Sequence, residues 1–264
     1  MNGKTFNRKN LKTLWELAKN DFTNRFAGSF FGIVWAFIQP MVLILMYVFI
    51  FQVAFPAMPV MGKYPYVLWL VAGLVPWFYF SEAVVTSTNC LLEYSYLVKK
   101  IVFPIKILPF VKIISSLFVH LFFIAFSLGI SVAVGNFSGM YFIQVIYYLI
   151  CLVLLVSSLG FFTSSILPFF RDFMPIVNIL MQMGMWLTPI LWDIEIIESP
   201  VLKMAMKANP MAYIVNGYRE TFLGIGWFWE HPVYMAFFWC ELMALGVLGI
   251  ISFRKMTPHF ADVL

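Results

Sequence analysis

Ionisable side chains are scarce in this sequence, and four polar residues recur at helical spacing: Glu82, Thr86, Asn89 and Glu93. Steps of three and four residues place them in one stripe along a helix. The chain as a whole is 62% apolar and 11% charged, whereas soluble domains are about 45–50% apolar and about 25% charged. This composition indicates an integral membrane protein, in which ionisable residues within the membrane are functional candidates. We expect the stripe to face the protein interior or the cytoplasmic mouth.

The sequence contains no grouping of residues typical of an enzyme or a metal centre. His120, His231 and His259 are scattered and have no cysteine or carboxylate cluster at ligand spacing, so no metal site is expected. No nucleophile, acid and base converge by spacing, so no catalytic residue is predicted. The absence of a chain of Asp, Glu and His that would relay protons argues against ion- or proton-coupled transport. For His120 and Glu241, each alone in an apolar run, a hydrogen bond to a neighbouring helix is favoured over a transport role.

The chain is not expected to bind ATP or any other cofactor. Gly3-Lys4-Thr5 resembles the end of a phosphate-binding loop, but the earlier glycine and the preceding strand of that motif are missing. If ATP hydrolysis powers transport, we therefore expect another chain to bind and hydrolyse the ATP. The net charge of +5 is modest, and the basic residues lie in loops beside apolar runs. That position fits anionic lipid headgroups rather than nucleic acid.

Six apolar runs are predicted to be transmembrane helices, which gives an all-α integral membrane fold. Each holds at least 20 residues, about the number needed to cross roughly 30 Å of hydrocarbon. An amphipathic helix over residues 10–26 precedes them and is expected to lie in the membrane interface. The predicted runs are residues 33–55, 66–85, 107–134, 141–167, 173–192 and 233–253.

The distribution of basic residues predicts the orientation. Most of the 17 lysines and arginines lie before the first run, in alternate connections or after the last run, so both termini are expected in the cytoplasm. We interpret residues 1–264 as a single transmembrane domain. It consists of an interface helix and turn (1–32), a six-span region (33–253) and a cytoplasmic tail (254–264).

Two connections have helical patterns of their own. Residues 91–101 are predicted to form an amphipathic cytoplasmic helix before Pro104, which would be a docking surface. In the connection on the opposite side, residues 200–208 and 211–223 form two patterns too short to span. We expect two short re-entrant helices before the last span, and two helices lying flat outside the membrane are the alternative.

Polar residues in two spans fall on shared helical faces. Asn178, Gln182 and Trp186 share one face, and Trp35 and Gln39 share another. These faces are candidates for lining a polar channel or for a helix interface.

Residues 25–40 are predicted to be the place where the interface helix turns into the membrane. Gly28 and Gly32 have the small-xxx-small spacing that permits close approach of two backbones. Arg25 is expected at headgroup depth on the cytoplasmic side.

Several segments together resemble a known family. The pieces are Arg25-Phe-Ala-Gly-Ser-Phe-Phe-Gly-Ile-Val-Trp35 with Gln39-Pro40, Ala72-Gly-Leu-Val-Pro-Trp77-Phe78, Lys100-Ile-Val-Phe-Pro104, Phe170-Arg-Asp172, Thr188-Pro-Ile190, Asn209-Pro-Met211 with Tyr218-Arg219, and the tail Pro258-His-Phe-Ala-Asp262. In this order they resemble the permease subunits of type-2 ABC exporters for lipid-linked polysaccharides. The tail is similar to that of the O-antigen and related branch.

The resemblance implies an assembly and a cargo. A second copy of the permease and two separate ATP-binding-cassette ATPase subunits would complete the transporter, with Mg-ATP bound by the ATPases. The cargo would be a polymer on an undecaprenyl diphosphate carrier, moved across the bacterial plasma (inner) membrane through a channel between the permeases. The chain itself would be no enzyme.

The resemblance also implies roles for particular residues, all of them expectations. Its implied sites are an entrance for the lipid diphosphate (Arg25, Gly28, Ser29, Trp35), a channel lining (Gln39, Asn178, Gln182, Trp186), a coupling surface for the ATPase (Glu93, Tyr94, Lys99, Lys100) and an outer gate (Asn209, Tyr218, Arg219). A teichoic acid exporter or a small-molecule exporter of the same fold is the alternative within transport. An integral-membrane glycosyl- or acyltransferase is the alternative outside it.

Overall fold

The computed structural model describes residues 8–54, 65–99, 103–137 and 139–264, and these residues form helices, turns and loops without a strand. The predicted all-α class is confirmed for this part of the chain. The α-helices are α1 (Arg8–Asn24), α2 (Trp35–Val48), α3 (Tyr66–Glu93), α4 (Ser95–Val98), α5 (Ile107–Ala133), α6 (Gln144–Ile166), α7 (Phe173–Leu187), α8 (Pro200–Lys207), α9 (Pro210–Leu223), α10 (Pro232–Met256) and α11 (Phe260–Val263).

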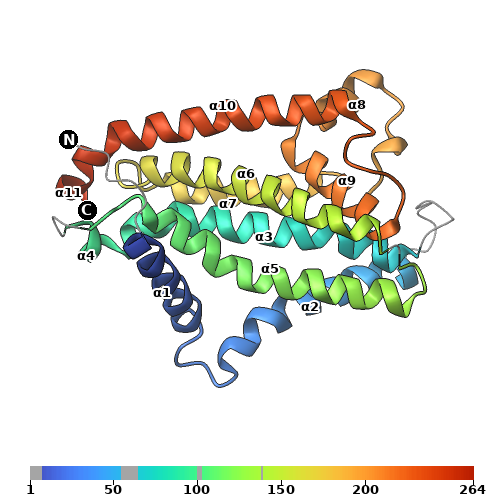
Figure 1. The fold of residues 1–264 in the computed structure, drawn as a ribbon, viewed down its shortest axis with the longest axis horizontal. Helices are drawn as coiled ribbons and strands as arrows, with labels where there is room; N and C mark the ends of the chain where they lie inside the picture. The colour runs from blue at the N-terminus through green and yellow to red at the C-terminus, as the bar shows by residue number, and fades with distance from the viewer. Residues whose placement is uncertain (1–7, 55–64, 100–102, 138) are drawn as a thin grey trace.

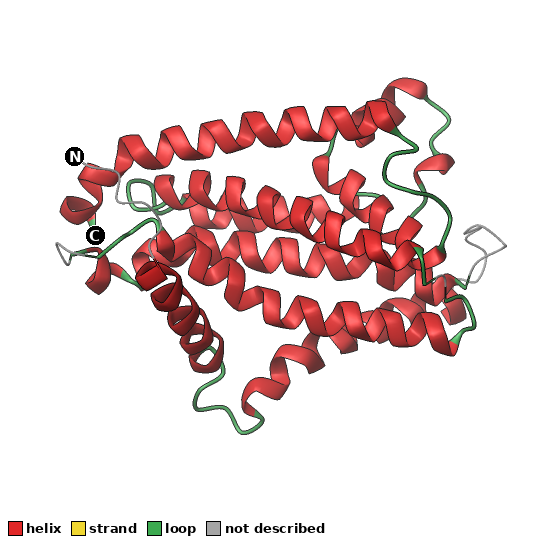
Figure 2. Cartoon of the chain, viewed as in Figure 1, coloured by secondary structure: helices red, strands yellow, loops and turns green. Residues whose placement is uncertain are grey.

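The long helices lie side by side in one bundle, with loops at its two ends (Figure 1, Figure 2). α4 and α11 lie at one end, which we call the α11 end, and α8 lies at the other, the α8 end. The turn after α1 and the start of α2 stand away from the bundle. Short 3-10 turns precede α2 (Gly32–Val34), α6 (Tyr141–Ile143) and α11 (Thr257–His259), and a π-helical segment (Phe49–Ala54) follows α2.

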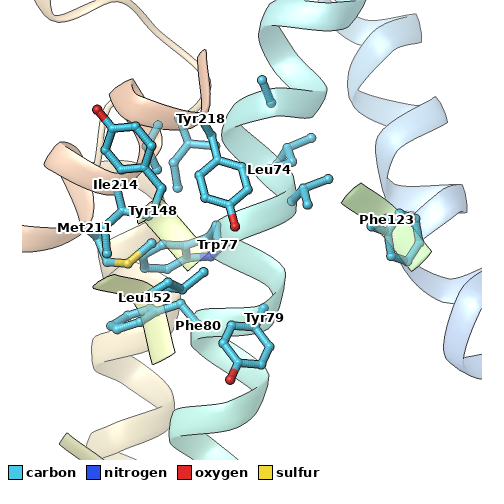
Figure 3. Close-up of a cluster of buried hydrophobic side chains, with 14 of the residues drawn as sticks. Leu74, Trp77, Tyr79, Phe80, Phe123, Tyr148, Leu152, Met211, Ile214 and Tyr218 are labelled. Carbon is cyan, nitrogen blue, oxygen red and sulfur yellow. The ribbon is translucent and has the colours of Figure 1, made fainter. Parts of the chain in front are cut away.

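α3 is the central helix of the bundle. It packs against α5, α6, α7 and α9, and every residue from 68 to 77 is buried. Figure 3 shows the core that results, in which Trp77 and Phe80 of α3 lie near Leu152 of α6 and Met211 of α9. A helix that is apolar on all sides is typical of the middle of a membrane protein.

Within the described residues, five stretches are long and apolar enough to cross a membrane: Gly32–Ala54, Tyr66–Glu93, Ile107–Ala133, Tyr141–Ile166 and Pro232–Val263. Each contains one of the six predicted runs over most of its length. The exception is the predicted run 173–192, which was expected to be a helix of full spanning length. The helix there, α7, has only 15 residues, because Thr188 is extended before Pro189.

The second predicted run is too short, and the helix predicted for residues 91–101 is wrong in extent. α3 continues to Glu93 because Thr88, Cys90 and Leu91 remain buried beyond the predicted end at 85. Among the described residues of this connection, only the four of α4 (Ser95–Val98) form a separate helix, and residues 100 and 101 of the predicted helix lie outside the described part.

α1 is amphipathic, as predicted, and its buried face packs on α5. Leu14 and Ala18 lie in one apolar cluster with Ile107 and Val111 of α5. Trp15 meets Phe118 of α5 edge to face, with ring centroids 5.5 Å apart. α1 therefore has a protein partner in addition to any membrane surface.

Candidate functional site

A network of buried charges joins α1, α3 and α5 near the α11 end. Lys112 of α5 is 3% exposed, and its ammonium group contacts Asp21 of α1 and, at 2.6 Å, Glu93 of α3. Arg25, just after α1, pairs with Glu82 of α3 and lies 3.5 Å from Asp21. Two cations, one just after α1 and one on α5, are thus held among three carboxylates from α1 and α3.

Hydroxyl groups complete this network. Tyr94 donates to Asp21 at 2.6 Å, Arg25 donates to Ser115 at 3.4 Å, and the Ser116 hydroxyl donates to Glu82 at 3.2 Å. Burial alone would raise the pKa of the Asp21 carboxyl, but the hydrogen bonds from Lys112 and Tyr94 favour its charged form and leave its pKa below the usual value.

The network contains residues that were predicted to serve two separate sites. Arg25 was predicted for the lipid entrance, and Glu93 and Tyr94 for coupling, yet all three contact the same cluster. The two carboxylates of the polar stripe on α3, Glu82 and Glu93, both contact this network, and their side chains are 33% and 47% exposed. Lys99 is exposed at the end of α4, and Lys100 lies outside the described residues.

The turn between α1 and α2 carries the other predicted entrance residues, and the close backbone approach expected there is not seen among the described residues of this chain. Gly28 and Gly32 have positive φ values of 86° and 51°, and a Cβ atom at either would meet nothing within 4 Å among the described residues. The glycines therefore provide left-handed backbone rather than close packing. Ser29 donates to the carbonyl of Phe26 at 3.3 Å, and Trp35 is exposed at the start of α2.

The predicted channel residues lie exposed on apolar helices. Gln39 on α2 and Asn178, Gln182 and Trp186 on α7 are all exposed, with Trp186 at 62%. α2 and α7 are neighbours at one point, where the Tyr47 hydroxyl is 3.7 Å from the sulfur of Met185. Exposed side-chain amides in a membrane need a hydrogen-bond partner or water. These faces of α2 and α7 therefore suit a water-filled channel or a contact with a second chain.

The residues predicted for an outer gate lie toward the α8 end, and two of them hold the end of α7. Arg219 of α9 is 6% exposed and donates to the carbonyls of Pro189 and Ile190 at 2.7 and 2.6 Å. Its guanidinium carbon lies 3.5 Å from the centroid of the Trp69 ring. Asn209 caps α9 by accepting from Met211 N at 3.0 Å and donates to Thr188 at 2.8 Å.

Tyr218 is fully buried and lies in the core, near Trp77 and Tyr148 (Figure 3). Its hydroxyl lies 2.8 Å from His120 Nε2, and the His120 ring stacks on Tyr79 with centroids 4.8 Å apart. The expected interhelical hydrogen bond of His120 is therefore confirmed. The corresponding expectation for Glu241 is not, since its buried Oε2 has no partner among the described residues.

Several residues with structural roles at these sites were not predicted as site residues. Lys112 was not predicted as a site residue, although a lysine inside the predicted apolar run 107–134 is itself a signal. Gln144 of α6 ties down the segment after α9 by donating to the Gly226 carbonyl at 2.8 Å and accepting from Phe228 N at 3.0 Å. Gly217 leaves room for the Tyr148 ring, which a Cβ would overlap.

Replacing Gly217 with alanine should destabilise the packing of α9 on α6 by about 1–3 kcal/mol, the usual cost of overfilling a packed core. The control is Gly129→Ala in α5, where a Cβ would meet nothing within 4 Å. Thermal unfolding of the detergent-solubilised full chain measures both. Equal melting temperatures for the two variants would contradict the role of Gly217.

A cavity of about 770 Å³ opens at the α8 end between α8, α9 and the start of α10. Its lining includes the rings of Tyr213, Tyr234 and Phe237 and the carboxylates of Glu220 and Glu230. The Tyr234 hydroxyl is buried with no partner in the described part of the chain. Mostly apolar walls with a few convergent polar groups are typical of small-ligand sites.

The long apolar helices around a buried α3 define a multi-pass membrane protein. Residues 12–223 match the family model described as ABC-2 type transporter. The chain belongs to the ABC-2 type transporter family, whose members are ABC transporter permeases.

Curated relatives match nearly the whole chain. An O-antigen export system permease protein RfbA from Myxococcus xanthus is 26% identical over 241 residues, which cover 90% of this chain and 87% of that protein. A protein of the same name from Klebsiella pneumoniae is 25% identical over 252 residues, which cover 94% of this chain and 93% of that protein.

Proposed function

We propose that this chain is the permease subunit of an ABC exporter that moves an undecaprenyl-diphosphate-linked polysaccharide of the O-antigen type across the bacterial inner membrane. The observation that carries the proposal is the match to O-antigen export permeases over 87–93% of their own length. The exposed amides on α2 and α7 and the ring-lined cavity at the α8 end support a polar, sugar-bearing cargo.

In this proposal the α11 end faces the cytoplasm and the chain crosses the membrane six times. α7 would be the short fifth crossing. Its 15 residues rise about 22 Å at 1.5 Å per residue, less than the roughly 30 Å of hydrocarbon, so the loops on either side of it would complete the span. α8 and α9 would be the re-entrant pair, held against the end of α7 by Arg219 and Asn209.

Two copies of the chain would form the channel, with two separate ATPase subunits beneath. α4 and the α1–α3–α5 charge network would receive the ATPase motion, because α1 is tied to α3 and α5 by Lys112 and Tyr94.

The direct test is to purify the tagged full chain from its native cell and assay the complex for ATP hydrolysis. We expect an ATP-binding-cassette subunit to co-purify, and hydrolysis to rise with an undecaprenyl-diphosphate-linked glycan but not with the free glycan. The absence of an ATPase partner, or stimulation by apolar drugs alone, would contradict the proposal.

The proposed orientation gives a second prediction. A cysteine in place of Met204 on α8, which is 76% exposed, should react with a membrane-impermeant maleimide in intact spheroplasts. A cysteine in place of Lys255, near the α11 end, should react only after the membrane is opened. The reverse pattern would show that the topology is inverted.

Arg25 gives a third prediction, for the lipid entrance. Its side chain is 22% exposed beside Glu82, so a diphosphate can compete with that carboxylate for the guanidinium. Arg25→Ala should abolish the stimulation of ATP hydrolysis by the lipid-linked glycan, whereas Glu82→Gln, which keeps the cation, should preserve it. Wild-type stimulation in the Arg25→Ala complex would rule out this role.

A further inference from the structure

A groove of about 690 Å³ lies between α5, α6 and α10, apart from the sites described above. Its walls are apolar side chains of all three helices, among them Phe110, Leu154, Phe161 and Met243. The outward faces beside it are also apolar, with Ile150 on α6 and Val247 on α10 both exposed. An apolar face on the outside of a bundle of spanning helices is suited to contact with the hydrocarbon of the bilayer, so lipid can reach the groove.

Small side chains leave the space that forms the groove, and the hydroxyl groups among them already have hydrogen-bond partners. Ser157 and Ser158 of α6 and Gly246 of α10 line the groove. The two serine hydroxyls donate within α6, to the carbonyls of Val153 at 2.7 Å and Leu154 at 2.9 Å. With its hydroxyls satisfied in this way, the surface suits a hydrocarbon chain rather than a polar ligand.

Two cations line the groove at its α11 end. Lys106 precedes α5, Arg254 lies in the last turn of α10, and both are exposed. Among the described residues neither takes part in an ion pair. Positive charge on one side of a membrane, at the end of an apolar groove between helices, is the pattern that binds anionic lipid headgroups.

The length of the groove fits one acyl chain. It reaches from Arg254 to Trp239 along α10, about 22 Å at 1.5 Å per residue. One leaflet contributes roughly 15 Å of hydrocarbon, half of the bilayer core. A chain anchored at Arg254 would therefore run about ten residues along α10, past Gly246 to the level of Met243, and the groove is long enough to hold it.

We propose that this groove binds one anionic glycerophospholipid, with its phosphate between Lys106 and Arg254 and an acyl chain along α10. The long stems of both cations allow them to reach the headgroup level. The lipid would fill the groove between α5, α6 and α10 and so support the last span. The proposal does not depend on the identity of the exported cargo.

The test is native mass spectrometry of the full chain released from nanodiscs that hold equal amounts of phosphatidylglycerol and phosphatidylethanolamine. The wild-type chain should retain phosphatidylglycerol preferentially. Lys106→Ala and Arg254→Ala should each lower that preference about five-fold, the effect of one cation near a membrane surface. Lys255→Ala, which removes a neighbouring exposed cation outside the groove, should leave it unchanged.

A second pair of variants tests the apolar part of the groove. Gly246→Phe should fill it and lower retention of both lipids, whereas Val247→Phe, one residue further and facing outward, should not. Equal retention of the two lipids by the wild-type chain, or an equal loss with Lys255→Ala, would overturn the proposal. Displacement of phosphatidylglycerol by an equimolar polyprenyl diphosphate, or by a second copy of the chain, would also overturn it.

Discussion

Replacing Lys112 with methionine should release α1 from the bundle. Lys112 is the buried cation that contacts Asp21 and Glu93, so its removal leaves the Asp21 carboxylate buried without that partner. Removing one member of a buried ion pair costs about 3–5 kcal/mol. α1 has 17 residues, and an isolated helix of that size is only marginally stable in water. We expect the amides of α1 to exchange hydrogen faster in the purified full chain, as measured by mass spectrometry.

Two controls separate the ion pair from a general loss of folding. The double variant Asp21→Asn, Lys112→Met removes both charges and should recover most of the protection. Lys106→Met removes an exposed cation before the same helix and should leave α1 protected. Unchanged exchange in the Lys112→Met chain would mean that the network does not hold α1 in place.

The same contact should depend on pH in a defined direction. The pKa of Asp21 is lowered in the folded protein, so the stabilisation is fully present above the ordinary carboxyl pKa of about 4. It should be lost as the pH falls through the lowered pKa and the carboxylate takes up a proton. Hydrogen exchange of α1 at decreasing pH, corrected for the intrinsic rate, measures this loss.

Replacing Arg219 with methionine should free the end of α7 and abolish export. Methionine fills part of the volume but leaves the carbonyls of Pro189 and Ile190 without the donors they now have. Each buried polar group left unsatisfied costs about 1–3 kcal/mol. The contact with the Trp69 ring, worth about 2 kcal/mol when desolvated, is lost as well.

The Arg219→Met chain should have a lower melting temperature in detergent and should fail to support export in cells. Arg219→Lys should lie between wild type and Arg219→Met, because an ammonium group keeps the charge but lacks the planar fork that reaches two carbonyls at once. Arg171→Met, an exposed arginine between α6 and α7, should behave as wild type. A melting temperature for Arg219→Met equal to that of Arg171→Met would contradict the role given to the guanidinium.

The sequence was sufficient to predict the helices whose apolar runs are long. α5, α6 and α10 lie almost where the runs 107–134, 141–167 and 233–253 predict them, because composition decides the position of a span. α8 and α9 begin at Pro200 and Pro210, residues that favour the first turn of a helix. The end of α7 was missed because the apolar run continues past Pro189, where the backbone is already extended.

The candidate site was less predictable, because contacts between distant residues leave no local pattern. The spacing of Glu82 and Glu93 indicated that they share a face. It gave no sign that Lys112 lies between Glu93 and Asp21, because Lys112 and Asp21 are 91 positions apart in the sequence. The spacing of Gly28 and Gly32 had two physical explanations, close packing and positive φ, and only the backbone angles distinguish them. Arg219 was predicted as a gate residue from the resemblance alone, without its partners.

The fit of the Tyr148 ring over Gly217 restricts how α9 can move. The ring occupies the place where any other residue would carry a Cβ. A shift of α9 along α6 by a fraction of a turn would bring a side chain of α9 against the ring, so the ring would have to leave this position first. Arg219, two residues further along, fixes the same helix to the end of α7. If α9 opens and closes a passage, α6, α9 and the end of α7 must therefore move together as one rigid body. The change in backbone conformation that this motion needs has to occur in the loops around them.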